Sequence, residues 1–329
     1  MESLLQGGQY MNKLLLNAFY LCGSLLSDRP GVRFVEGDYG TFGMSFYARI
    51  RQLLVNEIGK SSIPTTVALL LCGVSLVSLG MTGEGWASCD LAHRMLADSD
   101  RHSEQFLTHV EVEMRNRLRM GAFSINMALA LYVGCTPFTE LRDLQEQANV
   151  LDTYEELEMW PSQSPWIDPS GNSSSQDFQQ TPTHTISTFV AHVQLMQIAS
   201  DALQSLYHED SEPVGLIFYL QKQSAIEQRL THWLQSLPNH LHFDLDIDPL
   251  PLPHQTTLLL VFHAVKLLTL RPLLERPGLR CCLDSVDRTT AENACVEEAV
   301  AIWRLLSRYR ERFTLRRSSI LLSFSGYVA

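Results

Sequence analysis

The 329-residue sequence lacks the short motifs that mark common catalytic sites. It contains no GxSxG, no HExxH and no glycine-rich loop followed by Lys-Ser/Thr, so hydrolase, zinc-protease and phosphate-loop chemistry have no support. The seven cysteines include no CxxC pair and are odd in number, which excludes a zinc-ligand pattern and a disulfide framework and suits a reducing compartment. We therefore expect that this chain is not an enzyme and that it contains no catalytic, cofactor-binding, metal-binding or DNA-binding residue.

Positive charge is also scarce. The chain has 25 Lys and Arg against 36 Asp and Glu, a net charge of −11, which repels a nucleic-acid backbone. One basic run, from Arg308 to Arg317, alternates with Tyr309, Phe313 and Leu315. It has the composition of a nuclear-import or nucleic-acid patch, but we interpret it as a helix end whose arginines extend over an apolar face.

The alternation of apolar and polar residues that is typical of strands is nearly absent, and apolar residues recur instead at three- and four-residue intervals. This pattern predicts an all-α fold, a large single helical domain with a long flexible central loop. We expect helices over residues 14–26, 41–57, 65–81, 85–98, 110–133, 186–206, 216–237, 256–270 and 289–313. Residues 1–160 form the N-terminal half, 161–184 a flexible Pro/Ser-rich loop, and 185–329 the C-terminal half.

Residues 61–83 carry no charge, and this stretch is long enough for a membrane span. However, Ser, Thr and Pro occupy the start of this stretch and Gly80 and Gly83 its end, so we expect a helix buried on all sides. The N-terminal apolar segment faintly resembles a signal peptide, but a buried first helix fits its charges better. Leu70 and Trp86 are predicted to lie in the core, and Cys22 and Cys72 to act as small hydrophobic residues.

The segment His240–Asp248 alternates polar and apolar residues. If extended, it places on one face the side chains of His240, His242, Asp244, Asp246 and Asp248, a set that suits a divalent cation. The flanking prolines instead favour a rigid connector with a hydrated face. Cys281 and Cys282 are adjacent without a second pair, which indicates no site.

Several blocks, in this order, resemble the fungal-specific transcription factor domain, the middle homology region of fungal zinc-cluster regulators. They are Ser62–Gly73, Gly85–Ala97, Glu113–Asn126, Leu131–Pro137, Tyr154–Trp160, Phe262–Leu274 and Trp303–Arg317. Each block is degenerate alone, but their order covers nearly the whole chain. Arg119-Met120 and Cys135 depart from the family pattern, and the chain stops at Ala329 where family members normally continue.

The resemblance implies an all-α regulatory domain of a nuclear transcription factor that controls a biosynthetic pathway, such as one of secondary metabolism. It implies partners in the transcription machinery or a co-regulator, and is compatible with a small-molecule effector and a homo-oligomer. The family's zinc cluster requires CxxC spacing, so this chain is expected to hold no zinc or other cofactor and to reach DNA only indirectly, without membrane contact. The alternative is a helical protein-interaction or small-molecule-sensing module without transcriptional function.

Overall fold

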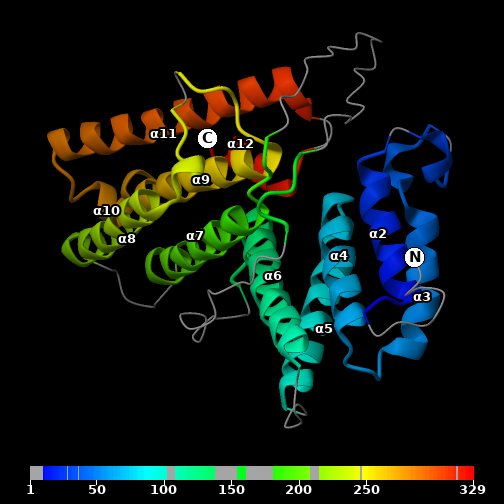
Figure 1. The fold of residues 1–329 in the computed structure, drawn as a ribbon. Helices are drawn as coiled ribbons and strands as arrows, with labels where there is room; N and C mark the ends of the chain where they lie inside the picture. Colours follow the sequence, from blue (N-terminus) through cyan, green and yellow to red (C-terminus); the bar gives the residue numbers. More distant parts are fainter. Residues whose placement is uncertain are drawn as a thin grey trace. The chain divides into compact units, whose positions relative to one another are not determined.

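The computed structural model describes residues 10–27, 29–35, 37–101, 108–137, 154–160, 181–207, 215–244, 247–315 and 318–329. Within these ranges the regular elements are helices, and the β-pairing consists of two isolated bridges, so the predicted all-α class is confirmed. The chain divides into two compact units, Met1–Gln147 and Ala148–Ala329 (Figure 1). The predicted domain boundaries stay a prediction, and residues 161–180 of the expected loop lie outside the described ranges.

The first unit is built around the charge-free helix that the sequence predicted. Its helices are α2 (Lys13–Leu25), α3 (Met44–Glu57), α4 (Ile63–Ser78), α5 (Thr82–Arg101) and α6 (His109–Val133), with the 3-10 turns η1 (Pro30–Val32) and η2 (Tyr39–Thr41). Helix α4 packs against α2, α5 and α6. Leu14, Leu21, Ile50 and Leu76 form part of a core shared by α2, α3 and α4. Helix α6 ends at Gly134, whose φ of 76° is the left-handed conformation expected of a C-terminal glycine.

Two glycines set the distance between α4 and α5. A Cβ atom on Gly73 would lie 2.3 Å from the Cys89 sulfur, and one on Gly85 would lie 2.7 Å from the Gly73 carbonyl oxygen. The backbones therefore approach too closely for any side chain here. The prediction that this helix begins at Gly85 was wrong: α5 begins at Thr82, and Gly85 lies inside it, where the close approach to α4 requires a glycine.

The core predictions for this unit hold for Leu70, which is 3% exposed, and for Cys72. Cys22 and Trp86 are only half-buried, so Trp86 contributes less to the core than predicted. Burial raises the pKa of the Cys72 thiol to about 12 and that of Cys89 to the same value, which keeps both thiols protonated.

The second unit is built around α9 (Pro253–Glu275). Its other elements are α7 (Thr185–Leu206), α8 (Leu216–Ser236), η4 (Asn239–Leu241), α10 (Pro277–Arg280), α11 (Ser285–Phe313) and α12 (Ile320–Val328). Helices α7, α8, α11 and α12 all pack against α9. Among the described helices, α9 alone is long and apolar enough to cross a membrane, and 61% of its apolar window is buried inside the fold. Those neighbours identify it as a core helix.

The last two helices of this unit differ from the prediction. Helix α11 begins at Ser285 and not at Thr289, because the Asp284 side chain accepts a hydrogen bond from the Asp287 backbone N–H and caps the helix four residues earlier. Helix α12 was not predicted. Its Leu321, Leu322 and Phe324 side chains are buried.

The third difference is at Pro272, which was expected to end α9 but lies inside it. Proline lacks the N–H that would bond the carbonyl of Leu268, four residues earlier. That carbonyl accepts a hydrogen bond of 2.7 Å from the Tyr207 hydroxyl, and the Tyr219 hydroxyl bonds the adjacent Thr269 carbonyl at 2.8 Å. Tyr207, directly after α7, thus supplies the donor that the proline lacks, Tyr219 on α8 adds a bond to the next carbonyl, and the helix continues.

We expect Tyr207→Phe to lower the free energy of unfolding by about 1 kcal/mol, because it leaves the Leu268 carbonyl without its donor. In a Pro272→Ala background the helix regains its own N–H, so the same change should cost clearly less. Urea denaturation of the four proteins of this double-mutant cycle measures the difference. Equal costs in the two backgrounds would show that the tyrosine does not compensate for the proline.

Candidate functional site

A short backbone ladder opens the second unit. The segment Tyr154–Trp160 runs antiparallel to residues 181–184: the Trp160 N–H donates to the Thr181 carbonyl at 3.0 Å, and the Thr183 N–H donates to the Glu158 carbonyl at 2.8 Å. The His184 N–H completes the ladder by donating to the Glu156 carbonyl. Residues 181–184, the end of the segment expected to be flexible, are thus held in place by the block Tyr154–Trp160.

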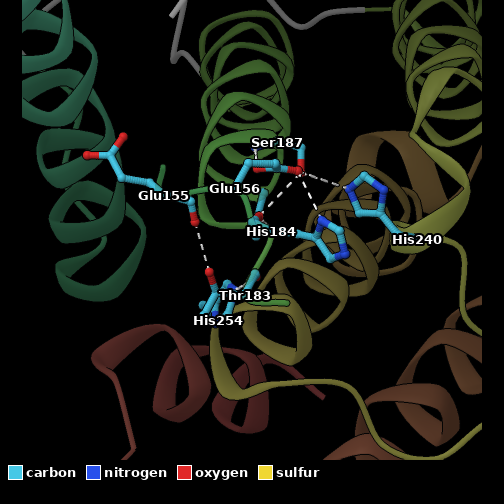
Figure 2. A network of polar contacts seen from close by, with 8 residues as sticks. Glu155, Glu156, Thr183, His184, Ser187, His240 and His254 are labelled. Carbon is cyan, nitrogen blue, oxygen red and sulfur yellow. Dashed lines mark hydrogen bonds and ion pairs between the residues drawn. The ribbon is translucent and has the colours of Figure 1, made fainter. Parts of the chain in front are cut away.

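Glu156 caps the N-terminus of α7. The residue before this helix, His184, has a φ of 49° and provides no side-chain cap of its own. Instead, Glu156 Oε2 accepts the Ser187 backbone N–H at 3.0 Å, and Glu156 Oε1 accepts the Ser187 hydroxyl at 2.6 Å (Figure 2). A carboxylate at this position satisfies free helix donors and complements the positive end of the helix dipole.

Two histidines complete the group, which we call the α7 clamp: Glu156, His184, Ser187 and His240. His184 Nδ1 lies 3.1 Å from Glu156 Oε1, and His240 Nε2 lies 2.8 Å from Ser187 Oγ. The two imidazole rings stack, with centroids 3.8 Å apart. Figure 2 shows the four side chains converging from the ladder, from α7 and from the turn η4.

The charges in the clamp follow from these contacts. Burial alone would raise the pKa of Glu156, but its bonds from Ser187 and His184 outweigh that effect and the pKa is lowered. Burial lowers the pKa of His240, and the neighbouring His184 acts in the same direction against the attraction of Glu156. An ionised Glu156 is therefore the charge around which the clamp is organised.

A third histidine, His254 at the start of α9, contacts the same ladder. His254 Nε2 lies 2.7 Å from the Thr183 carbonyl oxygen, and the His254 ring stacks on Trp160 with centroids 5.9 Å apart. Thr183 also donates its hydroxyl to the Glu155 carbonyl at 2.9 Å. The ladder is thereby attached to α7, η4 and the start of α9 together.

The clamp does not form a Ser-His-Glu catalytic triad. A serine hydroxyl has one proton, and here it goes to Glu156, since a carboxylate can only accept. His240 Nε2 must then be the donor to Ser187, whereas a general base would accept from it. The histidine is also not placed between the serine and the carboxylate, so the arrangement stabilises structure without activating a nucleophile.

Metal binding is limited by the ring stacking. Ligand atoms of Glu156, His184 and His240 lie within 4.8 Å of one another, close enough for one ion. An imidazole binds a metal in its own ring plane, and these two rings are face to face with an angle of 17° between them. One ring must therefore rotate before both can bind the same ion.

The described residues of His240–Asp248 do not form one extended strand, so the alternative with its polar side chains on one face, which the flanking prolines disfavoured, is not realised. His240 lies in the turn η4, and His242 Nε2 contacts the Leu237 carbonyl at 2.9 Å. Asp244 and Asp248 bond to each other through backbone and side chain and close a tight turn. Asp246 lies outside the described residues. Of the described members of this set, His240 belongs to the clamp, whose other residues come from other elements.

Two arginines of the basic run lie near the end of α11 and bond to backbone carbonyls of the same unit. Arg308 Nη2 donates to the Asp248 carbonyl at 2.5 Å, and Arg312 donates to the Leu250 carbonyl. These two arginines attach the 248–250 connector to the end of α11. Arg316 and Arg317 lie outside the described residues. Cys281 and Cys282 are exposed, with their sulfurs 4.0 Å apart.

A buried charged cluster joins α9 to α11 and was not predicted. Glu298 is 8% exposed, its Oε2 lies 2.6 Å from His263 Nδ1, and its Oε1 accepts from Lys266. Burial would raise the pKa of Glu298, but the bonds and positive charge of its two partners outweigh that effect and lower it. We call these three residues the α9–α11 ion cluster. The spacing His263–Lys266 on one helix was its only sequence signal.

One groove in the second unit lies between α7 and α8. Its volume is about 590 Å³, and its polar lining includes Gln194, Gln197, Gln228, Arg229 and His232 above the buried Trp233. Arg229 in its wall is paired with Asp201 at 2.5 Å. The lining offers amide and imidazole hydrogen bonds, which suit a small polar molecule, and no arrangement for bond-breaking chemistry.

Comparison with known proteins gives the context for these features. No protein-family model and no solved structure matches the chain. It is 25% identical over 313 residues to the nitrogen assimilation transcription factor nit-4 of Neurospora crassa, an alignment that covers 94% of the chain and 27% of nit-4. It is 26% identical to the nitrogen assimilation transcription factor nirA of Emericella nidulans, covering 98% of the chain and 35% of nirA.

A third relative is the quinic acid utilization activator of Emericella nidulans, 28% identical over 67% of the chain and 26% of its own length. The chain thus spans about a quarter to a third of the length of these curated relatives. The resemblance seen in the ordered sequence blocks is confirmed: over 94–98% of its length the chain is similar to parts of two fungal nitrogen assimilation transcription factors, and over 67% to part of a quinic acid utilization activator.

Proposed function

We propose that this chain is the helical regulatory region of a fungal transcription regulator, acting in the nucleus without a DNA reader of its own within these residues. The observation that supports the proposal is the alignment of 94–98% of the chain with two nitrogen assimilation transcription factors. The all-α fold and the net charge of −11 agree with a region that contacts proteins and reaches DNA through another module.

The names of the relatives favour control of a metabolic pathway. Two concern nitrogen assimilation and one quinic acid utilization, so nutrient use is supported more directly than the secondary metabolism suggested by the sequence blocks. Partners in the transcription machinery and a small-molecule effector are parts of the same proposal. The groove between α7 and α8 is the place where such an effector would bind.

The experiment joins the 329-residue chain to an unrelated DNA-binding module and measures a reporter gene in a filamentous fungus. We expect expression to differ from that with the DNA-binding module alone, and to respond to a change of nitrogen source or to quinate. Leu70→Asp in the same fusion should abolish the difference, and exposed Val55→Asp should retain it. Unchanged expression with a folded, nuclear fusion would contradict the proposal.

A second candidate function, a sensing module without transcriptional activity, is favoured by the groove alone. Gln197→Leu with Gln228→Leu removes two of its amides while leaving the helices intact. Loss of the nutrient response with the basal reporter effect retained would assign the groove to effector binding within a regulator. Cytoplasmic residence of the unfused chain, together with a silent reporter, would instead support the second candidate.

A further inference from the structure

Helix α11 has an apolar face directed away from the core. Its inner face, with Ile302, Leu305 and Tyr309, is buried in the second unit, where α11 packs along α9 (Figure 1). On the other side Val296, Val300 and Trp303 are 60%, 41% and 66% exposed. With 3.6 residues per turn these three side chains follow one line along the helix, and we call them the α11 outer stripe.

The charges of α11 are divided between its two ends. The N-terminal half carries mostly acidic side chains: Asp287, Glu292, Glu297 and Glu298, against Arg288. The C-terminal half carries mostly basic ones: Arg304, Arg308, Arg310 and Arg312, against Glu311. Such a helix repels a parallel copy of itself and attracts an antiparallel one, because each acidic half then faces a basic half.

The same antiparallel arrangement matches individual residues. Glu292 and Arg310 lie equally far on either side of residue 301, and both fall on one flank of the outer stripe by the helical periodicity. Glu297 and Arg304 lie almost symmetrically about the same point and fall on the other flank. A twofold axis near Val300 therefore brings each acidic residue opposite the basic residue of the second copy on the same flank.

The apolar residues fit this axis as well. Val300 lies near the axis, and Trp303 of each copy lies opposite Val296 of the other. Tryptophan is enriched among the residues that dominate binding at protein interfaces, and Trp303, exposed with Val300 one helical turn before it, is suited to that role. Arg308 and Arg312 are not needed, since they bond the 248–250 connector.

We propose that the α11 outer stripe is a homodimer interface, on which a second copy of this chain docks with its α11 antiparallel. The proposal goes beyond the regulatory function and does not depend on reporter activity. Trp303 and the valines exclude water at the centre, while Glu292 and Arg310 pair at both ends and set the direction. Because the flanking pairs are exposed, they determine orientation more than affinity, and the dimer should weaken as salt increases.

Sedimentation velocity of the full 329-residue chain between about 1 and 100 µM tests this interface. We expect a monomer–dimer equilibrium whose dissociation constant rises at least about tenfold on Trp303→Glu, as for a central interface residue. Ile217→Glu, at an equally exposed apolar position of α8, is the matched control and should leave the dissociation constant unchanged. Circular dichroism of each variant verifies that both remain folded.

A charge exchange tests the antiparallel orientation. Glu292→Arg alone places like charges opposite each other twice in the dimer and should weaken it, and Arg310→Glu alone should do the same. The double variant Glu292→Arg/Arg310→Glu re-forms both pairs with reversed signs and should restore most of the affinity. A chain that stays monomeric at 100 µM, a dimer insensitive to Trp303→Glu, or a double variant weaker than both single ones would overturn the proposal.

Discussion

Leu70→Asp is expected to unfold the first unit. Leu70 is 3% exposed on α4, the helix that packs against α2, α5 and α6. A carboxylate placed there has no cation or hydrogen-bond donor supplied for it, and a charge buried without a partner is among the most destabilising changes a core can receive. We expect a loss of about 4 kcal/mol or more, a large part of the total stability of an ordinary domain.

The measurement is thermal and urea unfolding followed by circular dichroism, with Val55→Asp as control. Val55 lies on α3 in the same unit and is 74% exposed, so the same carboxylate should change stability by no more than about 0.5 kcal/mol. If the Leu70 variant is soluble and melts as the parent does, α4 is not the buried helix described here.

The sequence predicted the helices well because a helix that packs on one side repeats its apolar residues at three- and four-residue intervals. Helices α2, α6, α7 and α8 begin and end within about one residue of their predicted limits, inside the usual uncertainty of a helix boundary. Residues at the helix ends themselves were enough to predict these boundaries. Gly134, for example, supplies the left-handed residue that ends α6 without help from any distant part of the chain.

Predictions were wrong where a distant partner replaces a local signal. A proline such as Pro272 normally ends a helix, but the hydroxyl of Tyr207, which lies 61 residues before Leu268, takes the place of the missing donor to the Leu268 carbonyl. Gly85 was expected to begin α5, but it lies inside that helix, where α5 approaches Gly73 of α4 closely. In both cases a tertiary contact determines the local structure, and the apolar periodicity of one segment cannot predict such a contact.

The α7 clamp shows the same limit for a site. Glu156 and Ser187 are 31 residues apart, and Ser187 and His240 are 53 apart. The block Tyr154–Trp160 was recognised in the sequence, but no spacing within it indicates that its second glutamate caps a helix that begins at Thr185. His240 was noticed for a different reason, as part of an alternating segment that the structure shows as two turns.

Glu298→Gln is expected to destabilise the second unit by about 3 kcal/mol at neutral pH. The change keeps the size of the side chain but removes the negative charge between His263 and Lys266, and the half-buried Lys266 is then left beside a neutral group. Removing one partner of a buried ion pair costs more than removing both, because the remaining charge is uncompensated. Glu298→Leu with Lys266→Met should therefore recover much of the loss, which urea denaturation of the variants measures.

The same cluster predicts how stability depends on pH. The pKa of Glu298 is lowered in the folded chain, so the carboxylate stabilises the fold above the pKa of an unfolded glutamate. This contribution is lost as the pH falls through the lowered folded-state pKa, since the folded chain must then accept a proton that the unfolded chain binds more readily. The difference in unfolding free energy between the parent and Glu298→Gln should be constant at neutral pH and shrink below about pH 4.5. A difference that does not change down to pH 3 would mean that the charge of Glu298 does not hold α9 and α11 together.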